Sequence, residues 1–150
     1  MNTKVMFSSE KMDWTTPPMF FQELDREFHF TLDAAASDSN HLCKRYFTEK
    51  EDALKQKWTG RAWLNSPYGR QIGKWVKKAY EEVECGNAEL VVMLLPARTD
   101  TKYFHQYCMK VWPHGIRFIK GRLKFGDGKN SAPFPSMVVI FKKYAGKFGN

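Results

Sequence analysis

The sequence predicts a single α/β domain in which helices cover both faces of a mainly parallel β-sheet, giving three layers. Strand-like and helix-like segments alternate along most of the chain, and this order is typical of βα repeats with right-handed crossovers. The 90–95 segment is continuously apolar, as expected of a parallel strand that is buried on both faces. The chain has 150 residues, which suffice for one hydrophobic core but not comfortably for two domains.

The first predicted helix begins near Thr16. Thr16 and Pro17 suit the cap and the first position of a helix, because proline lacks an amide hydrogen that would be unpaired there. An apolar stripe with four-residue steps follows them: Phe20, Leu24 and Phe28. Residues 30–34 are a short β-prone run that ends in small residues, so we expect a strand that leads into a loop.

The middle of the chain adds a short helix, a strand and a long helix. Residues 48–51 match a capping box and predict the start of a short helix. Residues 61–64 predict a strand. From Ile72 onward, apolar residues recur at steps of three and four, and Gly86 stands where the end of this helix is expected.

The last third of the chain supplies the remaining strands. The apolar run 90–95 ends at Pro96 and is predicted to be the centre of the sheet. Thr99 or Asp100 is expected to cap a helix that runs to about Met109. Two further strands are predicted over 116–120 and 137–141, and a flexible loop over 126–131.

The formal charge of +8 and the isoelectric point of about 9.4 favour a polyanionic partner. Lysine and arginine contacts to phosphates release condensed counterions, so nucleic acid is the expected partner. Many small basic proteins nevertheless bind nothing specific. Charge therefore becomes informative only together with a chemical site.

The composition argues against several other classes of protein. Cys43, Cys85 and Cys108 form no Cys-x-x-Cys pair, and the histidines form no His-Glu-x-x-His motif, so we expect reduced, buried thiols and no metal. The 90–95 run is far shorter than the roughly 20 residues that span a bilayer. The first residues lack the apolar stretch of a secretion signal. We therefore expect no membrane partner and a cytoplasmic location.

The segment Asn65-Ser66-Pro67-Tyr68 has the residue types needed to methylate an aromatic amine. The lone pair of such an amine is delocalised into its ring, so hydrogen-bond acceptors must hold both of its hydrogens. The Asn65 side-chain oxygen can accept one hydrogen and the Ser66 carbonyl the other, while Pro67 restricts the backbone of Ser66. Tyr68 offers a ring on which a flipped base can stack.

The same four residues, with Gly69 after them, could also form an ordinary turn, because Asn, Pro and Gly all favour turns. Their position favours the chemical interpretation. The motif directly follows a predicted strand and directly precedes the strongest predicted helix. Open α/β sheets bind their ligands at the carboxyl ends of strands.

Two acidic residues are candidates for cofactor binding. Asp33 ends the first predicted strand and is followed by three alanines and Ser37, a loop through which the methionine part of a cofactor could pass, with the carboxylate near a positive group. Asp33 could equally cap a helix ahead of a packed alanine run. Asp52 could accept hydrogen bonds from a cofactor adenine or ribose, or pair locally with Lys55.

Several basic residues lie near predicted strand ends and are candidates for contact with nucleic acid. Most lysines and arginines are expected to form a solvated face, and a minority to contact phosphate. The candidates are Arg70, Arg98, Lys120 and Arg122.

The order and spacing of these segments resemble the phage-type Dam family of DNA N6-adenine methyltransferases, over about residues 15–141. The segments that carry the resemblance are Thr16-Pro17, Leu32-Asp33-Ala34-Ala35-Ala36, Phe47-Thr48, Asp52-Ala53-Leu54, Trp58, Asn65-Ser66-Pro67-Tyr68-Gly69, Leu94-Leu95-Pro96-Ala97-Arg98-Thr99-Asp100-Thr101 and Gly121-Arg122-Leu123-Lys124-Phe125.

The resemblance implies a Rossmann-like methyltransferase domain, S-adenosylmethionine as methyl donor, and site-specific methylation of adenine N6 in DNA. It also implies a phage or prophage origin, and the cytoplasm of a host if a phage encodes the protein. The residues implied to bind the cofactor are Thr16, Pro17, Asp33, Ala34, Ala35, Ser37, Asp52 and Asn65. Those implied to form the catalytic motif are Asn65, Ser66, Pro67 and Tyr68.

The chain departs from the family pattern in two places. Ser66 stands where the family more often has proline, but the expected acceptor there is a main-chain carbonyl, which any residue supplies. The stretch between Ala36 and Arg61 leaves little room for two full strands.

Other functions fit the same motif. Similar motifs serve enzymes that methylate RNA adenines or glutamine side chains, although the basic charge favours nucleic acid. Cytosine N4 methylation is less consistent with the sequence, because enzymes of that class usually have Ser or Asp, not Asn, in the first position of a similar motif. A catalytically silent, basic DNA-binding module is the alternative from outside the enzymes.

Overall fold

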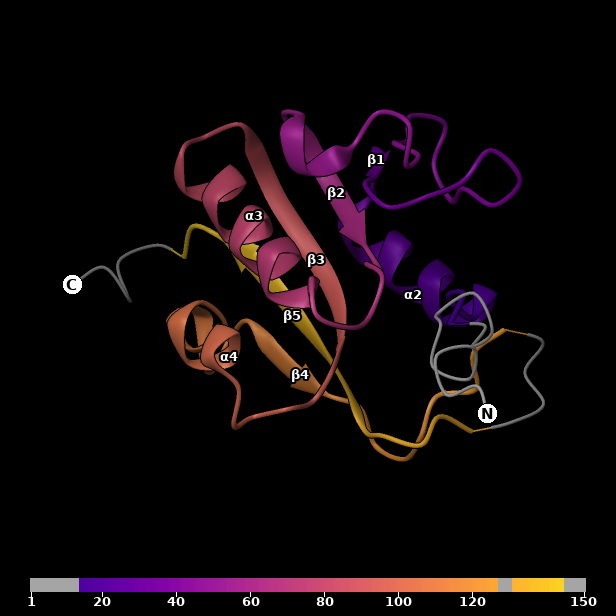
Figure 1. Ribbon diagram of the computed structural model, residues 1–150. Coiled ribbons are helices and arrows are strands. Elements are labelled where there is room, and N and C mark those ends of the chain that lie inside the picture. The colour runs from indigo at the N-terminus through magenta and orange to yellow at the C-terminus, as the bar shows by residue number, and fades with distance from the viewer. Residues whose placement is uncertain (1–13, 127–130, 145–150) are drawn as a thin grey trace.

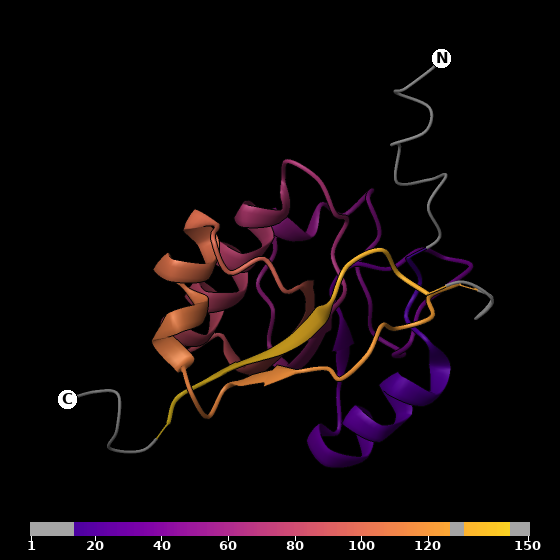
Figure 2. The same ribbon diagram turned by 90° about the horizontal axis from the view of Figure 1, so that it is seen from below.

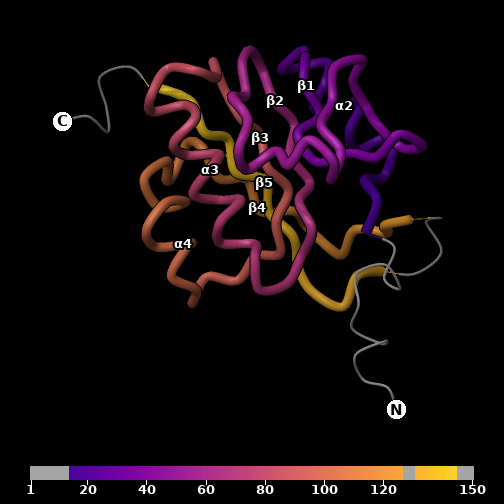
Figure 3. Tube along the Cα trace, turned by 45° about the horizontal axis from the view of Figure 1, so that its top comes forward, coloured from indigo at the N-terminus to yellow at the C-terminus, as the bar shows by residue number. Residues whose placement is uncertain are grey.

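Five strands form one mixed sheet in the computed structural model, which describes residues 14–126 and 131–144 (Figure 1). The strands are β1 (Leu32–Asp33), β2 (Gly60–Leu64), β3 (Ala88–Pro96), β4 (Ile116–Phe118) and β5 (Ser136–Lys142). Their spatial order is β1-β2-β3-β5-β4, which confirms β3 as the central strand. Figure 3 shows β3 and β5 side by side through the middle of the molecule.

The expectation of a mainly parallel sheet is wrong for half of the strand pairings. The pairs β1–β2 and β2–β3 are parallel, whereas β3–β5 and β5–β4 are antiparallel. The described residues between β4 and β5, 119–126 and 131–135, contain no helix. The apolar pattern could not reveal this direction, because a strand buried on both faces reads the same whichever way it runs.

Helices lie on both faces of this sheet (Figure 2). They are α2 (Pro18–Phe28), α3 (Ile72–Glu84) and α4 (Lys102–Gln106), with 3₁₀ turns η1 (Ala53–Lys55) and η2 (Cys108–Val111). Alternate residues of β3 serve two cores. Those that pack toward α3 and α4 are Val91, Met93 and Leu95. Those that pack toward α2 are Leu90, Val92 and Leu94.

Helix α2 begins one residue later than predicted. Pro17 occupies the N-cap position with extended backbone angles, and no side chain caps the helix. Thr16 does not cap α2 but bonds to another part of the chain. The buried positions of α2 are Phe21, Leu24 and Phe28, while Phe20 is only half-buried, so the stripe has a three-residue step as well as a four-residue one.

The capping box at residues 48–51 forms, but no α-helix follows it. Glu51 Oε1 accepts hydrogen bonds from the Thr48 amide (2.6 Å) and the Thr48 hydroxyl (2.8 Å). Asp52 then adopts a left-handed backbone conformation with φ of 56°, which interrupts the helical path. Only the 3₁₀ turn η1 follows. The irregular run from Ala36 to Thr59 agrees with the lack of room for two strands.

Helix α4 is capped by Thr101, not by Thr99 or Asp100. The Thr101 hydroxyl oxygen accepts from the Phe104 amide at 3.3 Å. The α-helix ends at Gln106, and η2 continues to Val111. By contrast, α3 matches its prediction closely, with Gly86 after its end at φ of 89°.

The remaining expectations have mixed outcomes. Strand β4 ends at Phe118, two residues short of the predicted Lys120. Most of the predicted 126–131 loop lies outside the described residues. All three cysteines are free, but Cys85 is exposed and Cys43 half-buried, so only Cys108 fits the expectation of a buried thiol. Within residues 14–126 and 131–144, no helix is long and apolar enough to cross a membrane.

A buried carboxylate joins α3 to the start of β2. Glu82 accepts hydrogen bonds from the amide of Trp58 (2.6 Å) and from Lys78 Nζ (3.1 Å). Trp58 is fully buried, and the Lys78 side chain is 16% exposed. Removal of this carboxylate therefore leaves a buried amide and a largely buried cation without their partner.

We expect Glu82→Ala to lower the free energy of unfolding by about 3 kcal/mol, the scale for breaking a buried ion pair. Urea denaturation measures this loss. Glu84→Ala, in the last turn of the same helix and exposed, is the matched control and is expected to change stability by no more than about 0.5 kcal/mol. Equal losses in both variants would contradict the anchoring role of Glu82.

Candidate active site

The carboxyl ends of β1 and β2 open into a cavity of about 890 Å³. Parallel strands end at the same edge of a sheet, so Asp33, the last residue of β1, and Asn65, the residue after β2, meet there. The cavity is lined by Trp14, Thr15, Thr16, Asp33, Ala34, Ala35, Ala36, Ser37, Asp38, Asn40, Leu42, Phe47, Thr48, Glu49, Asp52, Ala53, Trp63, Asn65, Ser66, Pro67, Tyr68 and Trp75. Every predicted catalytic or cofactor-binding residue is among them except Pro17, which lies beside the cavity at the start of α2.

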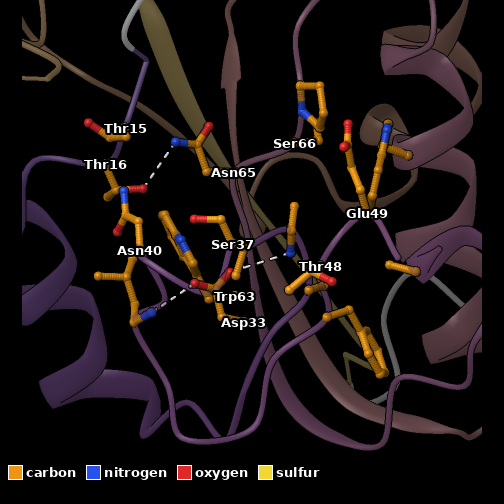
Figure 4. Close-up of a pocket in the computed structure, with 18 of the residues that line it drawn as sticks. Thr15, Thr16, Asp33, Ser37, Asn40, Thr48, Glu49, Trp63, Asn65 and Ser66 are labelled. Carbon is orange, nitrogen blue, oxygen red and sulfur yellow. Dashed lines mark hydrogen bonds between the residues drawn. The ribbon is translucent and has the colours of Figure 1, made fainter. Parts of the chain in front are cut away.

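The Asn65 side chain is fixed by two hydrogen bonds. Its Nδ2 donates to the Trp14 carbonyl (2.9 Å) and to the Thr16 hydroxyl oxygen (3.0 Å), the second of which is drawn in Figure 4. The Trp14 carbonyl can only accept, so it sets which end of the amide is the nitrogen. The other end, Oδ1, is buried and has no hydrogen-bond partner among the residues that the structure describes. Buried polar atoms are normally paired, so this acceptor is available to a ligand.

The residues after Asn65 add further polar atoms without partners. Ser66 is buried and its hydroxyl has no partner, while Pro67 is exposed. The Tyr68 hydroxyl is also buried and without a hydrogen-bond partner. Its burial raises the pKa of Tyr68, so this phenol stays protonated near neutral pH.

Tyr68 belongs to a group of four rings that we call the aromatic cluster: Trp14, Tyr68, Phe125 and Phe134. The Trp14 ring lies 6.0 Å from that of Tyr68 and 5.2 Å from that of Phe134. The cluster joins the chain before α2, the loop after β2 and the connection between β4 and β5. Of these rings, Trp14 and Tyr68 line the same cavity as Asn65.

Asp33 places a buried carboxylate in the same cavity, at the end of the neighbouring strand. It is 3% exposed, and its two oxygens accept from the amides of Leu42 (2.9 Å) and Ala35 (3.4 Å). Burial raises the pKa of Asp33, against smaller opposing effects from these amides and from His41. Among the described residues no lysine or arginine forms an ion pair with it, so the positive group expected beside Asp33 is not a side chain of either type.

The irregular segment after β1 closes the cavity. Residues 45–47 run beside Asp33, whose carbonyl accepts from the Phe47 amide at 3.1 Å. Asp52 lies in the lining and is also 3.8 Å from Lys55 Nζ, in an exposed pair that contributes little to stability. Both interpretations of Asp52 offered by the sequence are therefore compatible with its position.

The four predicted DNA-contacting residues lie outside this cavity. Arg70 lines a second cavity next to it. The Arg98 guanidinium carbon is 6.0 Å from the centre of the Phe134 ring, in the aromatic cluster. Arg122 donates to the Ala132 carbonyl at 3.3 Å, and Lys120 is exposed. Within the described ranges, no three His, Cys, Asp or Glu side chains gather as metal ligands.

Several lining residues could not be identified from the sequence. Trp14 stands 51 positions before Asn65, and no local pattern connects the two. Trp75 belongs to the apolar stripe of α3, where it is indistinguishable from a core residue. Glu49 lies within the capping box.

Comparisons with known proteins identify a family for this chain. A family model described as DNA N-6-adenine-methyltransferase (Dam) matches residues 3–149. A protein of Escherichia phage T1, named DNA N-6-adenine-methyltransferase, is 37% identical to this chain over 94 residues. That stretch covers 61% of this chain and 38% of the phage protein, so the match spans well under half of its length.

Proposed function

Since the chain belongs to the DNA N-6-adenine-methyltransferase (Dam) family, we propose that it methylates the N6 amine of adenine at specific sites in DNA, with S-adenosylmethionine as the methyl donor and a Rossmann-like domain as the scaffold. The observation that carries this proposal is the buried Oδ1 of Asn65, which has no hydrogen-bond partner within residues 14–126 and 131–144. An amine whose lone pair is delocalised needs an acceptor for each of its hydrogens before it can attack a methyl group. Asn65 supplies such an acceptor in a fixed orientation.

The neighbouring residues support the same chemistry. The Ser66 carbonyl is the proposed acceptor of the second N6 hydrogen, and Pro67 restricts its backbone to extended conformations. The aromatic cluster around Trp14 and Tyr68 supplies ring surface against which the base can stack. Adenine reaches this site only after it is flipped out of the duplex, which costs a few kcal/mol that stacking partly offsets.

The cavity also fits the proposed cofactor. Its volume is in the range of small-molecule sites. S-adenosylmethionine bound there would supply an electrophilic methyl carbon on a positively charged sulfur. The Asp33 carboxylate, buried and without a lysine or arginine partner, suits the cofactor's ammonium group. We propose that the cofactor is held by Thr16, Pro17, Asp33, Ala34, Ala35, Ser37, Asp52 and Asn65.

DNA is the proposed acceptor because the net charge is +8 and Arg70 follows the Asn65–Tyr68 segment by two positions. We propose that Arg70, Arg98, Lys120 and Arg122 contact phosphates. Affinity for DNA is then expected to fall steeply as salt rises, with a slope of roughly −0.9 for each phosphate neutralised.

Transfer of a labelled methyl group from S-adenosylmethionine to separate acceptors tests the proposal. Duplex DNA, RNA of the same sequence and a mixture of denatured proteins are offered under identical conditions. The proposal expects label in DNA. Label in RNA alone or in protein alone would show that this acceptor, and not DNA, is the substrate. Cofactor binding without transfer to any acceptor would indicate a catalytically silent module.

Thr16 is expected to position Asn65. Thr16→Val removes the acceptor at 3.0 Å from Asn65 Nδ2 but keeps the side-chain shape, whereas Thr16→Ser retains the hydroxyl. We expect kcat to fall roughly 5–10-fold in the valine variant, the scale of one hydrogen bond, and to recover in the serine variant. Steady-state kinetics measure this. A loss confined to the KM for S-adenosylmethionine would show instead that Thr16 acts only through the cofactor.

A further inference from the structure

A second cavity, of about 520 Å³, lies between α3 and α4 and has no part in the chemistry described above. Its lining is rich in positive charge and contains no acidic residue. The lining residues are Arg70, Ile72, Gly73, Lys74, Lys77, Thr101, Lys102, Tyr103, Gln106 and Tyr107. We call this feature the basic groove.

The cations of the basic groove are largely uncompensated. Arg70, Lys74, Lys77 and Lys102 are all exposed. Of these four, only Lys77 forms an ion pair with another described residue, Glu81 at 4.0 Å, and both side chains of that pair are more than half exposed. Such a pair is weak in water. Four cations around one groove produce a local positive electrostatic potential, which attracts anions.

The groove adjoins the active site through one loop. Arg70 follows Tyr68 by two positions, and α3 begins at Ile72, so the loop after β2 borders both cavities. Tyr103 in the groove lies close enough to Tyr68 in the active site to contribute, after burial, to the raised pKa of Tyr68. A polyanion lying in the groove would therefore pass directly beside the site that receives the base.

The groove also offers neutral hydrogen-bond donors. Gln106 and Tyr107 stand on the α4 side, opposite the lysines of α3. Phosphate contacts in DNA complexes commonly combine lysine and arginine with such amide and hydroxyl donors, and they position the duplex without reading its sequence.

We propose, on the premise of DNA methylation developed above, that the basic groove binds the phosphates of the DNA backbone next to the target adenine. It would fix the strand while the base enters the active-site cavity. Lys74, Lys77 and Lys102 would then supply affinity for any DNA sequence, in addition to Arg70.

The test compares two triple variants that remove the same charge. Lys74, Lys77 and Lys102 are changed to Gln in the groove variant, and Lys44, Lys57 and Lys143 are changed to Gln in the control. The control lysines are exposed and lie outside both cavities. Fluorescence anisotropy measures the affinity of each protein for a labelled duplex at several salt concentrations, and thermal unfolding confirms that both variants fold.

We expect the groove variant to lose roughly 5–10-fold in affinity per missing contact at about 0.1 M salt, and its slope of log affinity against log salt to become less steep by about 2–3. The control variant is expected to keep a slope of log affinity against log salt close to that of the wild type. Equal changes in both variants would overturn the groove proposal while leaving DNA methylation intact. A wild-type protein that binds no duplex would overturn both, and the two failures are therefore distinguishable.

Discussion

Replacement of Asn65 by alanine is expected to lower kcat for methyl transfer roughly 10²–10³-fold, the scale for loss of one preorganised polar group at a reacting centre. The substitution removes the buried Oδ1, which no other group in the described chain engages. Single-turnover kinetics with saturating DNA and cofactor measure the loss without interference from product release.

The Asn65 variant also loses the bonds from Nδ2 to Trp14 and Thr16, so its fold needs an independent check. Thermal unfolding is expected to remain cooperative, and the saturating S-adenosylmethionine used in the assay offsets the cofactor contact that is also assigned to Asn65. A transfer rate within two-fold of the wild type, in a folded variant, would contradict the assignment of Asn65 as the acceptor of an N6 hydrogen.

Asp33→Asn is expected to weaken S-adenosylmethionine binding by about 2–5 kcal/mol, or at least roughly 30-fold, because a buried charge pair with the cofactor ammonium would be lost. The fold is expected to survive. The asparagine oxygen can still accept from the Leu42 amide, and the bond lost, from Ala35, is the longer one at 3.4 Å. Isothermal titration calorimetry measures the affinity.

Two related ligands separate the ammonium from the rest of the cofactor. S-adenosylhomocysteine keeps the ammonium but lacks the positive sulfur, so the variant should bind it more weakly than the wild type does. 5′-Methylthioadenosine lacks the amino-acid part, so wild type and variant should bind it equally. A loss of the same size with methylthioadenosine would show that Asp33 shapes the cavity without contacting the ammonium.

The same carboxylate predicts a pH dependence of cofactor binding. Burial raises the pKa of Asp33 above its ordinary value of 3.8. The ionised form predominates above the raised pKa, so affinity is expected to be full there and to fall as the pH drops through it. The Asp33→Asn variant should not show this fall.

The sequence predicted elements wherever local patterns alone decide the structure. Helix α3 and strands β2, β3 and β5 match because a helical period, a short β-prone run or a continuous apolar run specifies them. The direction of β5 was missed, since its burial on both faces hides whether it runs parallel or antiparallel to β3. The α-helix predicted after Thr48 does not form, because Asp52 turns the backbone into a left-handed conformation.

The sequence predicted most residues of the site, but not the hydrogen bonds and helix packing that arrange them. Asn65 and Asp33 were identified because they lie at the carboxyl ends of two predicted strands, and the parallel pairing of β1 with β2 brings them to one edge. The fixed orientation of Asn65 was not foreseeable, because it depends on Trp14 and Thr16, about 50 positions away in the chain. The basic groove likewise requires α3 and α4 to pack together, which no local pattern reveals.

The most direct test of the account is to identify the methylated atom. Duplex DNA is incubated with the protein and S-adenosylmethionine, hydrolysed to nucleosides and analysed by mass spectrometry, with the Asn65→Ala variant in parallel. The account predicts N6-methyldeoxyadenosine with the wild type and a strongly reduced amount with the variant. N4-methyldeoxycytidine in its place, or no methylated nucleoside from a protein that binds both DNA and cofactor, would contradict it.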